Sequence, residues 1–157
     1  MPVTRISFRD ANYFSSFICD YLDEHPNLKP FYNRFPHLEN FAEQIAEKQF
    51  SEEKRSILVK TLLKQYAALE TSETTAKNIH LLNQQNTYTI TTGHQLNLFT
   101  GPLYFLYKIL SAINLCEELC ERYPKQNFVP IYWMATEDHD FEEINHFNFK
   151  DTKVQWN

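Results

Sequence analysis

The segment TYTITTGHQLNLFTGP, residues 87–102, marks the change from helical to strand patterns along the chain. Its first six residues are β-branched or aromatic and lie between Asn86 and Gly93, which predicts a strand over Thr87–Thr92. The two glycines of the chain, Gly93 and Gly101, both fall in this segment. Because glycine tolerates sharp turns and close backbone approach, we predict a loop that approaches a ligand. A plain strand-to-helix loop with a glycine at each bend is the alternative.

The residues that follow predict a helix and a second strand. Leu103–Arg122 has helical periodicity, and Pro102 suits the first turn, where a missing N–H costs nothing. Phe128–Ala135 is a nearly continuous apolar run, typical of a parallel strand buried on both faces, although Pro130 suits only an edge or the strand's start. Together these segments predict one right-handed βαβ unit. The apolar side of its helix is predicted to contain Leu103, Leu106, Tyr107, Leu110, Ile113 and Asn114.

Residues 1–85 are predicted to form a helical region before this unit. Apolar residues recur there at helical spacing, and Ser51 is a favourable N-cap. Ten aromatic residues lie from Phe8 to Phe50, and we expect them to form core rather than a partner-binding surface. The fold class is therefore α/β, with residues 86–157 forming the start of the sheet domain. The expected helices are Arg9–Leu22, Leu38–Gln49, Ser51–Leu69 and Ser72–Asn83, with an irregular connector over Asn27–Pro36.

Composition limits the classes of function. The net charge is -5 with both signs interspersed, which predicts neither nucleic-acid binding nor a basic membrane-binding face. Apolar residues make up 43% of the chain, but no apolar run approaches the length of a membrane-spanning helix, and the N-terminus lacks the apolar core of a signal peptide. We therefore expect a cytoplasmic protein. Cys19, Cys116 and Cys120 are expected to be packing residues, with a redox pair or half a metal site as the alternative.

Candidate catalytic residues follow the two predicted strands. Ligands of parallel α/β sheets bind beyond the carboxyl ends of the strands. The first strand leads to His94, and the second leads to Asp138, His139 and Asp140. Flanking carboxylates would orient the imidazole of His139 and favour its charged form, so it could act as a general acid or base. A metal site made by both histidines and an aspartate is the alternative; without a supporting cluster motif we predict no metal.

Two stretches carry a resemblance to a known family. TTGHQLNLFTGPLYFLYKILSAINL (residues 91–115) followed by FVPIYWMATEDHDFEEINH (residues 128–146) resembles the N-terminal part of the cysteine-adding enzymes of bacillithiol biosynthesis, the BshC family. The matching pattern is T-G-[QH]-Q, then L-x-T-G-P-L-Y, a helix with Y-K, and W-x-A-x-E-D-H-D-x-x-E-x-N-H. These long motifs, in this order, make the resemblance specific.

The resemblance implies more than the residues themselves establish. It implies a Rossmann-like core similar to class I nucleotidyltransferases, a coiled coil that makes a homodimer, and a ligase that joins cysteine to glucosaminyl-malate in the last step of bacillithiol synthesis. His94 would stand where class I nucleotide-binding enzymes have their first signature histidine. Family members are several times longer, so we expect a partial chain that is inactive when isolated.

The same resemblance, with the loop and helix-start arguments above, defines candidate substrate-binding residues. An amide-forming reaction needs an activated carboxyl group, so a nucleotide cofactor is compatible, although the sequence does not identify one. Lys108 has a simpler alternative as a solvated helix residue. A binding module without catalysis, for a nucleotide or a metabolite, and a helical interaction domain remain alternative functions. The candidate substrate-binding residues are Gly93, Gln95, Asn97, Thr100, Gly101, Tyr104, Lys108 and Glu137.

Overall fold

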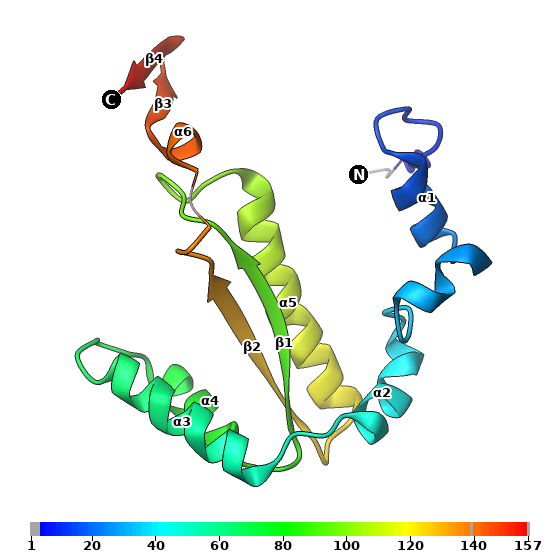
Figure 1. Ribbon diagram of the computed structural model, residues 1–157, viewed down its shortest axis with the longest axis vertical. Helices are drawn as coiled ribbons and strands as arrows, with labels where there is room; N and C mark the ends of the chain where they lie inside the picture. Colours follow the sequence, from blue (N-terminus) through cyan, green and yellow to red (C-terminus); the bar gives the residue numbers. More distant parts are fainter. Residues whose placement is uncertain (1–3, 139, 157) are drawn as a thin grey trace. The chain divides into compact units, whose positions relative to one another are not determined.

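The computed structural model describes residues 4–138 and 140–156, which belong to two compact units, Met1–Lys48 and Gln49–Asn157 (Figure 1). The first unit is helical, and the second contains two helices, a βαβ unit and a short hairpin. The boundary expected between residues 85 and 86 falls inside the second unit, where the chain passes from its helices to its first strand.

Short helices make up the first unit. Ser15 begins the first of them, because its side chain accepts a hydrogen bond from the Ile18 amide at 3.4 Å. The prediction that this helix starts at Arg9 is wrong: residues 8–12 form turns, and Asn12 has a φ of 50°. The bounds are α1 (Ser16–Leu22), the 3-10 helices η1 (Pro26–Phe31) and η2 (Leu38–Asn40), and α2 (Phe41–Glu47).

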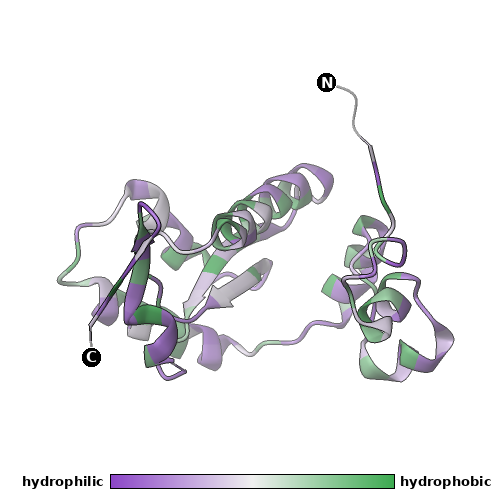
Figure 2. Cartoon of the chain, turned by 90° about the horizontal axis from the view of Figure 1, so that it is seen from above, coloured by the Kyte–Doolittle hydropathy of each residue, from purple (hydrophilic) through white to green (hydrophobic). Residues whose placement is uncertain are grey.

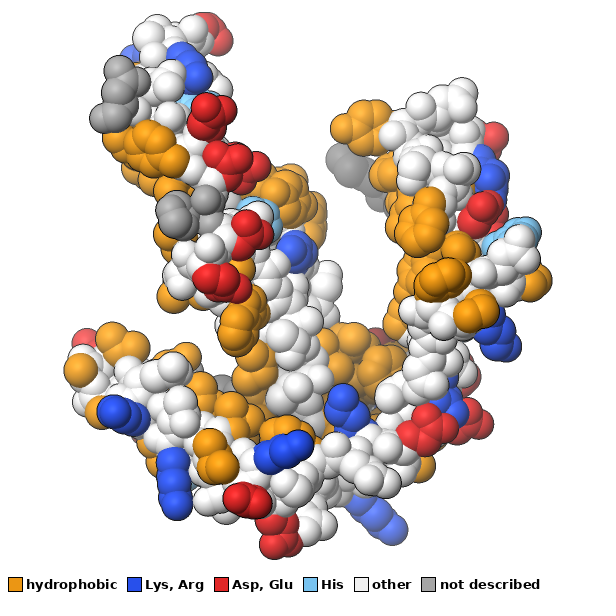
Figure 3. Space-filling view, viewed as in Figure 1, with side chains coloured by type: hydrophobic (Ala, Val, Ile, Leu, Met, Phe, Trp, Pro, Cys, Tyr) orange, Lys and Arg blue, Asp and Glu red, His pale blue; other side chains and the backbone are white. Residues whose placement is uncertain are grey.

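The aromatic residues of the first unit do not form the buried core predicted from their spacing. Tyr13 is 87% exposed and Phe31 is 81% exposed, and Figure 3 shows hydrophobic side chains on the surface of this unit. Tyr21, Tyr32 and Phe35 instead pack against one another, with ring centroids 5.0 to 6.1 Å apart. Short helices enclose little interior, so a unit of this size cannot bury so many rings.

Two helices begin the second unit. α3 (Glu52–Tyr66) starts at the predicted cap, because the Ser51 side chain accepts a hydrogen bond from the Lys54 amide at 3.3 Å. α4 (Glu73–Leu81) is capped in the same way by Ser72. Both helices contribute to a hydrophobic cluster with the second strand, which anchors them to the sheet. Its buried members are Val59, Ile79, Leu82 and Val129.

The βαβ unit confirms the predicted fold class. β1 (Thr87–His94) and β2 (Asn127–Met134) are parallel neighbours, paired from Thr87 opposite Asn127 to His94 opposite Met134. α5 (Leu103–Arg122) connects them and packs along both strands. Figures 1 and 2 show α5 on one side of the two strands and α3 and α4 on the other. The carboxyl ends of both strands therefore lie at one edge of a covered sheet.

The apolar side predicted for α5 is not the side that packs on the sheet. Leu103, Tyr107 and Leu110 are 64%, 61% and 53% exposed. The buried residues of this helix are Ala112, Cys116 and Leu119. α5 is apolar on both sides, so periodicity could not select the buried one, and the small Ala112 and Cys116 permit the closer approach to the strands.

A helical turn and a hairpin follow the βαβ unit and were not predicted. α6 (Phe141–Ile144) leads into β3 (His146–Phe149), which pairs with β4 (Thr152–Gln155) in an antiparallel hairpin. Lys150 and Asp151 form its turn with φ values of 46° and 62°. Positive φ at both central residues is typical of a type I′ turn, which usually contains glycine or asparagine. This turn has neither, so its sequence gave no hairpin signal.

Arg55 joins α3 to the end of α4 and provides a test of this packing. It is 6% exposed, and its guanidinium donates to the Leu82 carbonyl at 3.0 Å and to the Gln85 carbonyl at 3.3 Å. Arg55→Met will therefore leave two carbonyls without donors and lower the free energy of unfolding by about 2–3 kcal/mol. Urea unfolding measures this, with Lys60→Met on the exposed side of α3 as the control. Equal unfolding midpoints for the two variants would contradict the role of Arg55.

The cysteines of α5 should differ in reactivity. Cys116 is 4% exposed, and burial raises its pKa to about 11, whereas Cys120 is exposed. A rise from 9.0 to about 11 leaves roughly a hundredfold less thiolate at pH 8. We expect a thiol reagent at pH 8 to modify Cys120 in the folded chain and Cys116 only after unfolding. Rapid modification of both in the folded chain would contradict this.

The raised pKa of Cys116 also predicts a pH dependence of stability. The folded state holds this proton more tightly than the unfolded state, so its contribution is complete below pH 9 and is lost as the pH rises to about 11. Unfolding free energies at pH 8 and pH 10.5 should therefore differ more in the wild type than in Cys116→Ala. Identical pH dependence in the two proteins would show that Cys116 does not titrate in this way.

Candidate functional site

The structure brings together residues from both segments predicted to carry the site. β1 ends at His94 and β2 at Met134, and the Ala135 amide donates to the His94 carbonyl at 3.1 Å. Beyond the strands, the Gln95 side-chain amide donates to the Asp138 carboxylate at 3.1 Å. The loop after β1 and the segment after β2 therefore touch at the carboxyl edge of the sheet.

His94 is the best-positioned candidate for chemistry. Its Nε2 lies 2.8 Å from the Tyr104 hydroxyl in the first turn of α5. Its Nδ1 lies 3.2 Å from the Asn97 side-chain nitrogen and 3.2 Å from the Gln95 carbonyl. Both neutral tautomers are therefore supported: Nδ1–H can donate to Gln95 while Nε2 accepts from Tyr104, or Nε2–H can donate to Tyr104 while Nδ1 accepts from Asn97. A half-buried imidazole with such partners can accept or release a proton.

Gly93 serves the sheet more directly than the loop. It lies inside β1, opposite Trp133, and a Cβ at this position would stand 2.7 Å from the Trp133 carbonyl oxygen. Gly93 is therefore not a bend of the loop, and its absent side chain permits close approach of the two strands. Lys108 reaches the same place from α5, where its ammonium donates to the Gly93 carbonyl. An incoming anion would have to exchange with this hydrogen bond.

The end of the loop is conformationally strained. Phe99, Thr100 and Gly101 have successive φ values of 49°, 73° and 66°. Left-handed backbone is costly for a β-branched residue such as Thr100, of the order of 1–3 kcal/mol, and such strain is concentrated at functional sites. The Thr100 hydroxyl donates to the Phe99 carbonyl. A Cβ at Gly101 would stand 2.8 Å from the Asn97 side chain, so this glycine makes room for the asparagine that contacts His94.

A pocket of about 410 Å³ adjoins the loop. Its second wall comes from α6 and β3, and neither Glu137, Asp138 nor Asp140 lines it. Phe99 and Phe147 close one side in an edge contact, with ring centroids 5.0 Å apart. Its lining residues are Leu96, Asn97, Leu98, Phe99, Gly101, Pro102, Glu143, Ile144, His146, Phe147 and Asn148.

Three polar residues of this pocket, Glu143, His146 and Asn148, are not among those selected from the sequence. The His146 Nδ1 donates a 3.0 Å hydrogen bond to the side-chain oxygen of Asn145, which is 6% exposed. The polar run after β2 was the sequence signal for these residues. Their place in the pocket depends on the hairpin, which was not predicted and which brings His146, at the start of β3, beside the loop after β1.

The remaining predicted site residues differ in their surroundings. Glu137 and Asp138 are exposed, and Asp140 accepts a 2.9 Å hydrogen bond from the Glu142 amide as the cap of α6. His139 lies outside the described residues, so its catalytic role stays a prediction. Within residues 4–138 and 140–156, no three His, Cys, Asp or Glu side chains are grouped so as to hold a metal ion. No helix in those ranges is long and apolar enough to cross a membrane.

Comparisons with known proteins extend over the whole chain. A family model described as "Bacillithiol biosynthesis BshC, N-terminal Rossmann-like domain" matches residues 1–157. Three relatives are each named "Putative cysteine ligase BshC". That of Flavobacterium psychrophilum is 64% identical over 160 residues, covering 100% of this chain and 30% of the relative. That of Cytophaga hutchinsonii is 41% identical over 154 residues, which cover 98% of this chain and 30% of the relative. That of Bacillus cereus strain AH820 is 33% identical over 139 residues, which cover 88% of this chain and 26% of the relative.

These matches place the site in a known family while covering only part of its members. The chain spans about 30% of the length of its more similar relatives. The match includes both strands, α5 and the segments that follow the strands, and so confirms the resemblance seen in the motifs. The chain belongs to the BshC family of bacillithiol biosynthesis and corresponds to its N-terminal Rossmann-like domain.

Proposed function

We propose that a full-length protein carrying this domain joins cysteine to glucosaminyl-malate by an amide bond, the last step of bacillithiol synthesis. The observation that carries the proposal is the match of the whole chain to the BshC family, whose relatives are named as cysteine ligases. Dimerisation through a coiled coil and a cytoplasmic location are parts of the same proposal and rest on the family resemblance.

The site supports a role for His94 in proton transfer. In amide formation the amine nitrogen attacks an activated carboxyl carbon, the leaving group departs with its electron pair, and the nitrogen loses one proton. His94 would accept that proton, since Tyr104 and Asn97 hold its ring at the carboxyl edge of the sheet. The activated carboxyl group is an acyl-nucleotide or an equivalent activated intermediate.

The loop and the start of α5 would bind the substrates. Backbone amides at the start of a helix attract anions, and no side-chain hydrogen bond caps α5 at Pro102. Gln95 connects this loop to Asp138, so both segments would close around one ligand. Lys108, Thr100 and Glu137 are proposed to contribute from the same edge, and Asp138, His139 and Asp140 are proposed to assist proton transfer.

Product formation tests the proposal. A full-length protein carrying this domain, given cysteine, glucosaminyl-malate and a nucleoside triphosphate, should yield the amide product, detected by mass spectrometry. The isolated 157-residue chain should yield none, because it spans about 30% of its relatives. A full-length protein that shows a ligand-induced rise in melting temperature but no product would favour the binding-module alternative. Turnover by the isolated chain would refute the claim that residues beyond this domain are needed.

A further inference from the structure

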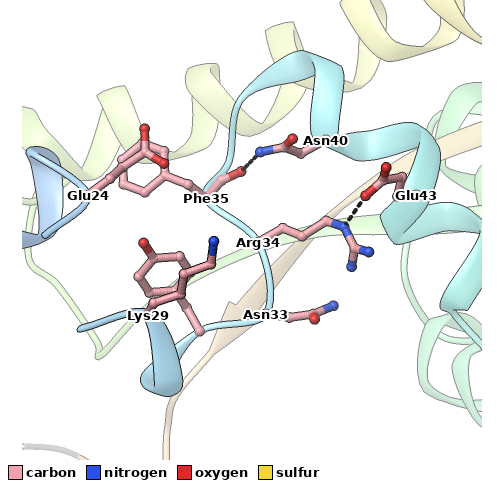
Figure 4. Close-up of a pocket in the computed structure, with 8 residues that line it drawn as sticks. Glu24, Lys29, Asn33, Arg34, Phe35, Asn40 and Glu43 are labelled. Atoms are coloured by element: carbon pink, nitrogen blue, oxygen red, sulfur yellow. Dashed lines mark hydrogen bonds and ion pairs between the residues drawn. The ribbon is translucent and has the colours of Figure 1, made fainter. Parts of the chain in front are cut away.

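The first unit has a pocket of its own, of about 440 Å³, lined only by residues between Glu24 and Glu43 (Figure 4). This volume lies within the range of small-molecule sites. The pocket is independent of the proposed ligase site, whose residues all belong to the second unit. Figure 4 shows Glu24 and Lys29 on one side of the pocket and the Arg34–Glu43 pair on the other.

The carboxylates and the guanidinium that line this pocket already have partners. Arg34 donates to both oxygens of Glu47, at 2.6 and 2.5 Å, and to Glu43 at 3.0 Å. The hydrogen bonds to Glu47 and Glu43 raise the pKa of Arg34, so its guanidinium stays protonated beside the two carboxylates. Glu24 lies 2.8 Å from the His37 ring nitrogen. Arg34 is therefore held by two carboxylates, and its guanidinium is not available to a ligand.

Lys29 and Tyr32 provide the groups that remain available. Within the described part of the chain, neither the Lys29 ammonium nor the Tyr32 hydroxyl has a hydrogen bond or ion pair with another side chain or with the backbone. The Tyr32 ring is held by edge contacts with Tyr21 and Phe35. The pocket thus has one positive charge without a partner and one positioned hydroxyl donor, a combination that suits a carboxylate.

Two asparagines supply acceptors. The Asn33 side-chain nitrogen donates to Gln44 at 2.9 Å and to Glu47 at 3.2 Å. The Asn40 side-chain nitrogen donates to the Phe35 carbonyl at 2.8 Å. Since each nitrogen already donates within the unit, the amide oxygens are the groups that can accept from hydroxyl groups on a ligand.

We propose that this pocket binds a small polyhydroxy carboxylate, whose carboxylate pairs with Lys29 and Tyr32 while its hydroxyls donate to Asn33 and Asn40. One feature of the pocket favours this class over a phosphate. Arg34, the side chain suited to bidentate phosphate binding, is occupied by carboxylates. The volume also accommodates a six-carbon chain with its hydrogen-bond partners.

An NMR titration of the 157-residue chain tests the proposal. The probe is D-gluconate, with D-sorbitol as the uncharged control of equal chain length and sorbitol 6-phosphate as the phosphate arm. Gluconate should shift the amides of residues 24–43 saturably, and sorbitol should bind at least about tenfold more weakly, since hydrogen bonds to charged groups contribute more than neutral ones. Lys29→Met should weaken gluconate binding about tenfold or more, and Tyr32→Phe should weaken it less.

The controls make each result decisive. Lys48→Met removes a lysine from the same unit that does not line the pocket, and it should leave gluconate binding unchanged. The amide spectra of the variants also show whether the unit stays folded. Absence of saturation, equal binding of sorbitol, tighter binding of sorbitol 6-phosphate, or unchanged binding by a folded Lys29→Met variant would each overturn the proposal. None of these results depends on ligase activity, so failure here leaves the proposed function unaffected.

Discussion

Replacing His94 by alanine in a full-length protein that carries this domain will lower the turnover of amide formation by about 10²–10⁴-fold, the usual contribution of a positioned acid or base. The loss follows from the contacts of the ring. Tyr104 holds Nε2 at 2.8 Å, and Asn97 contacts Nδ1 at 3.2 Å, so the imidazole has a defined orientation at the carboxyl edge of the sheet. A half-buried polar side chain with such contacts contributes little to the hydrophobic core, so the melting temperature should change by only a few degrees.

Two further variants separate proton transfer from loss of packing. His80→Ala removes an exposed histidine of α4 and should leave turnover unchanged. Tyr104→Phe keeps the ring beside His94 but removes the hydroxyl, so it should change the pH profile of turnover more than the Michaelis constant. His139→Ala, at a position assigned from the sequence, is expected to lower turnover as well. Full activity in His94→Ala would remove His94 from the mechanism.

Replacing Gly93 by valine will lower the free energy of unfolding by about 3 kcal/mol, the upper part of the range for forcing extra atoms into a packed position. A Cβ at Gly93 would stand 2.7 Å from the Trp133 carbonyl oxygen and 3.0 Å from the Trp133 Cβ. The neighbouring atom is backbone, which cannot rotate away as a flexible side chain can. The two strands would have to separate where they deliver His94 and Asp138 to the site.

Thr91→Val is the matched control for this variant. Thr91 lies two residues earlier in β1, on the same face of the strand, and is exposed. The Thr91→Val substitution introduces the same valine side chain and should change the free energy of unfolding by less than about 0.5 kcal/mol. Urea unfolding of the 157-residue chain compares the two. Equal stability of Gly93→Val and Thr91→Val would show that close strand approach does not explain the glycine.

The sequence predicted the parts of this fold that depend on local pattern. Thr87–Thr92 and Phe128–Ala135 have compositions that suit only strands in this context, and Pro102 and Tyr123 mark the ends of α5. The buried side of α5 could not be predicted, because both of its sides are apolar and the choice depends on which fits against the strands. The hairpin after β2 was missed because Lys150 and Asp151 adopt positive φ without glycine.

The candidate site was predicted in outline rather than in its contacts. His94 and Asp138 were selected because each follows a predicted strand, which is a topological argument. The Gln95–Asp138 hydrogen bond joins residues 43 positions apart and depends on the register of β1 against β2. The role of Asn97 depends on the left-handed backbone at Gly101, and no periodic pattern encodes such a conformation.

The small space at Gly101 also constrains how this loop can change in evolution. Asn97 occupies that space and reaches His94 from it, so a side chain at position 101 would displace the amide from the imidazole. Positions 94, 97 and 101 should therefore be inherited as one set among homologues. Lineages that lose the glycine should also have lost the asparagine, while positions on the exposed side of α5 vary independently of all three.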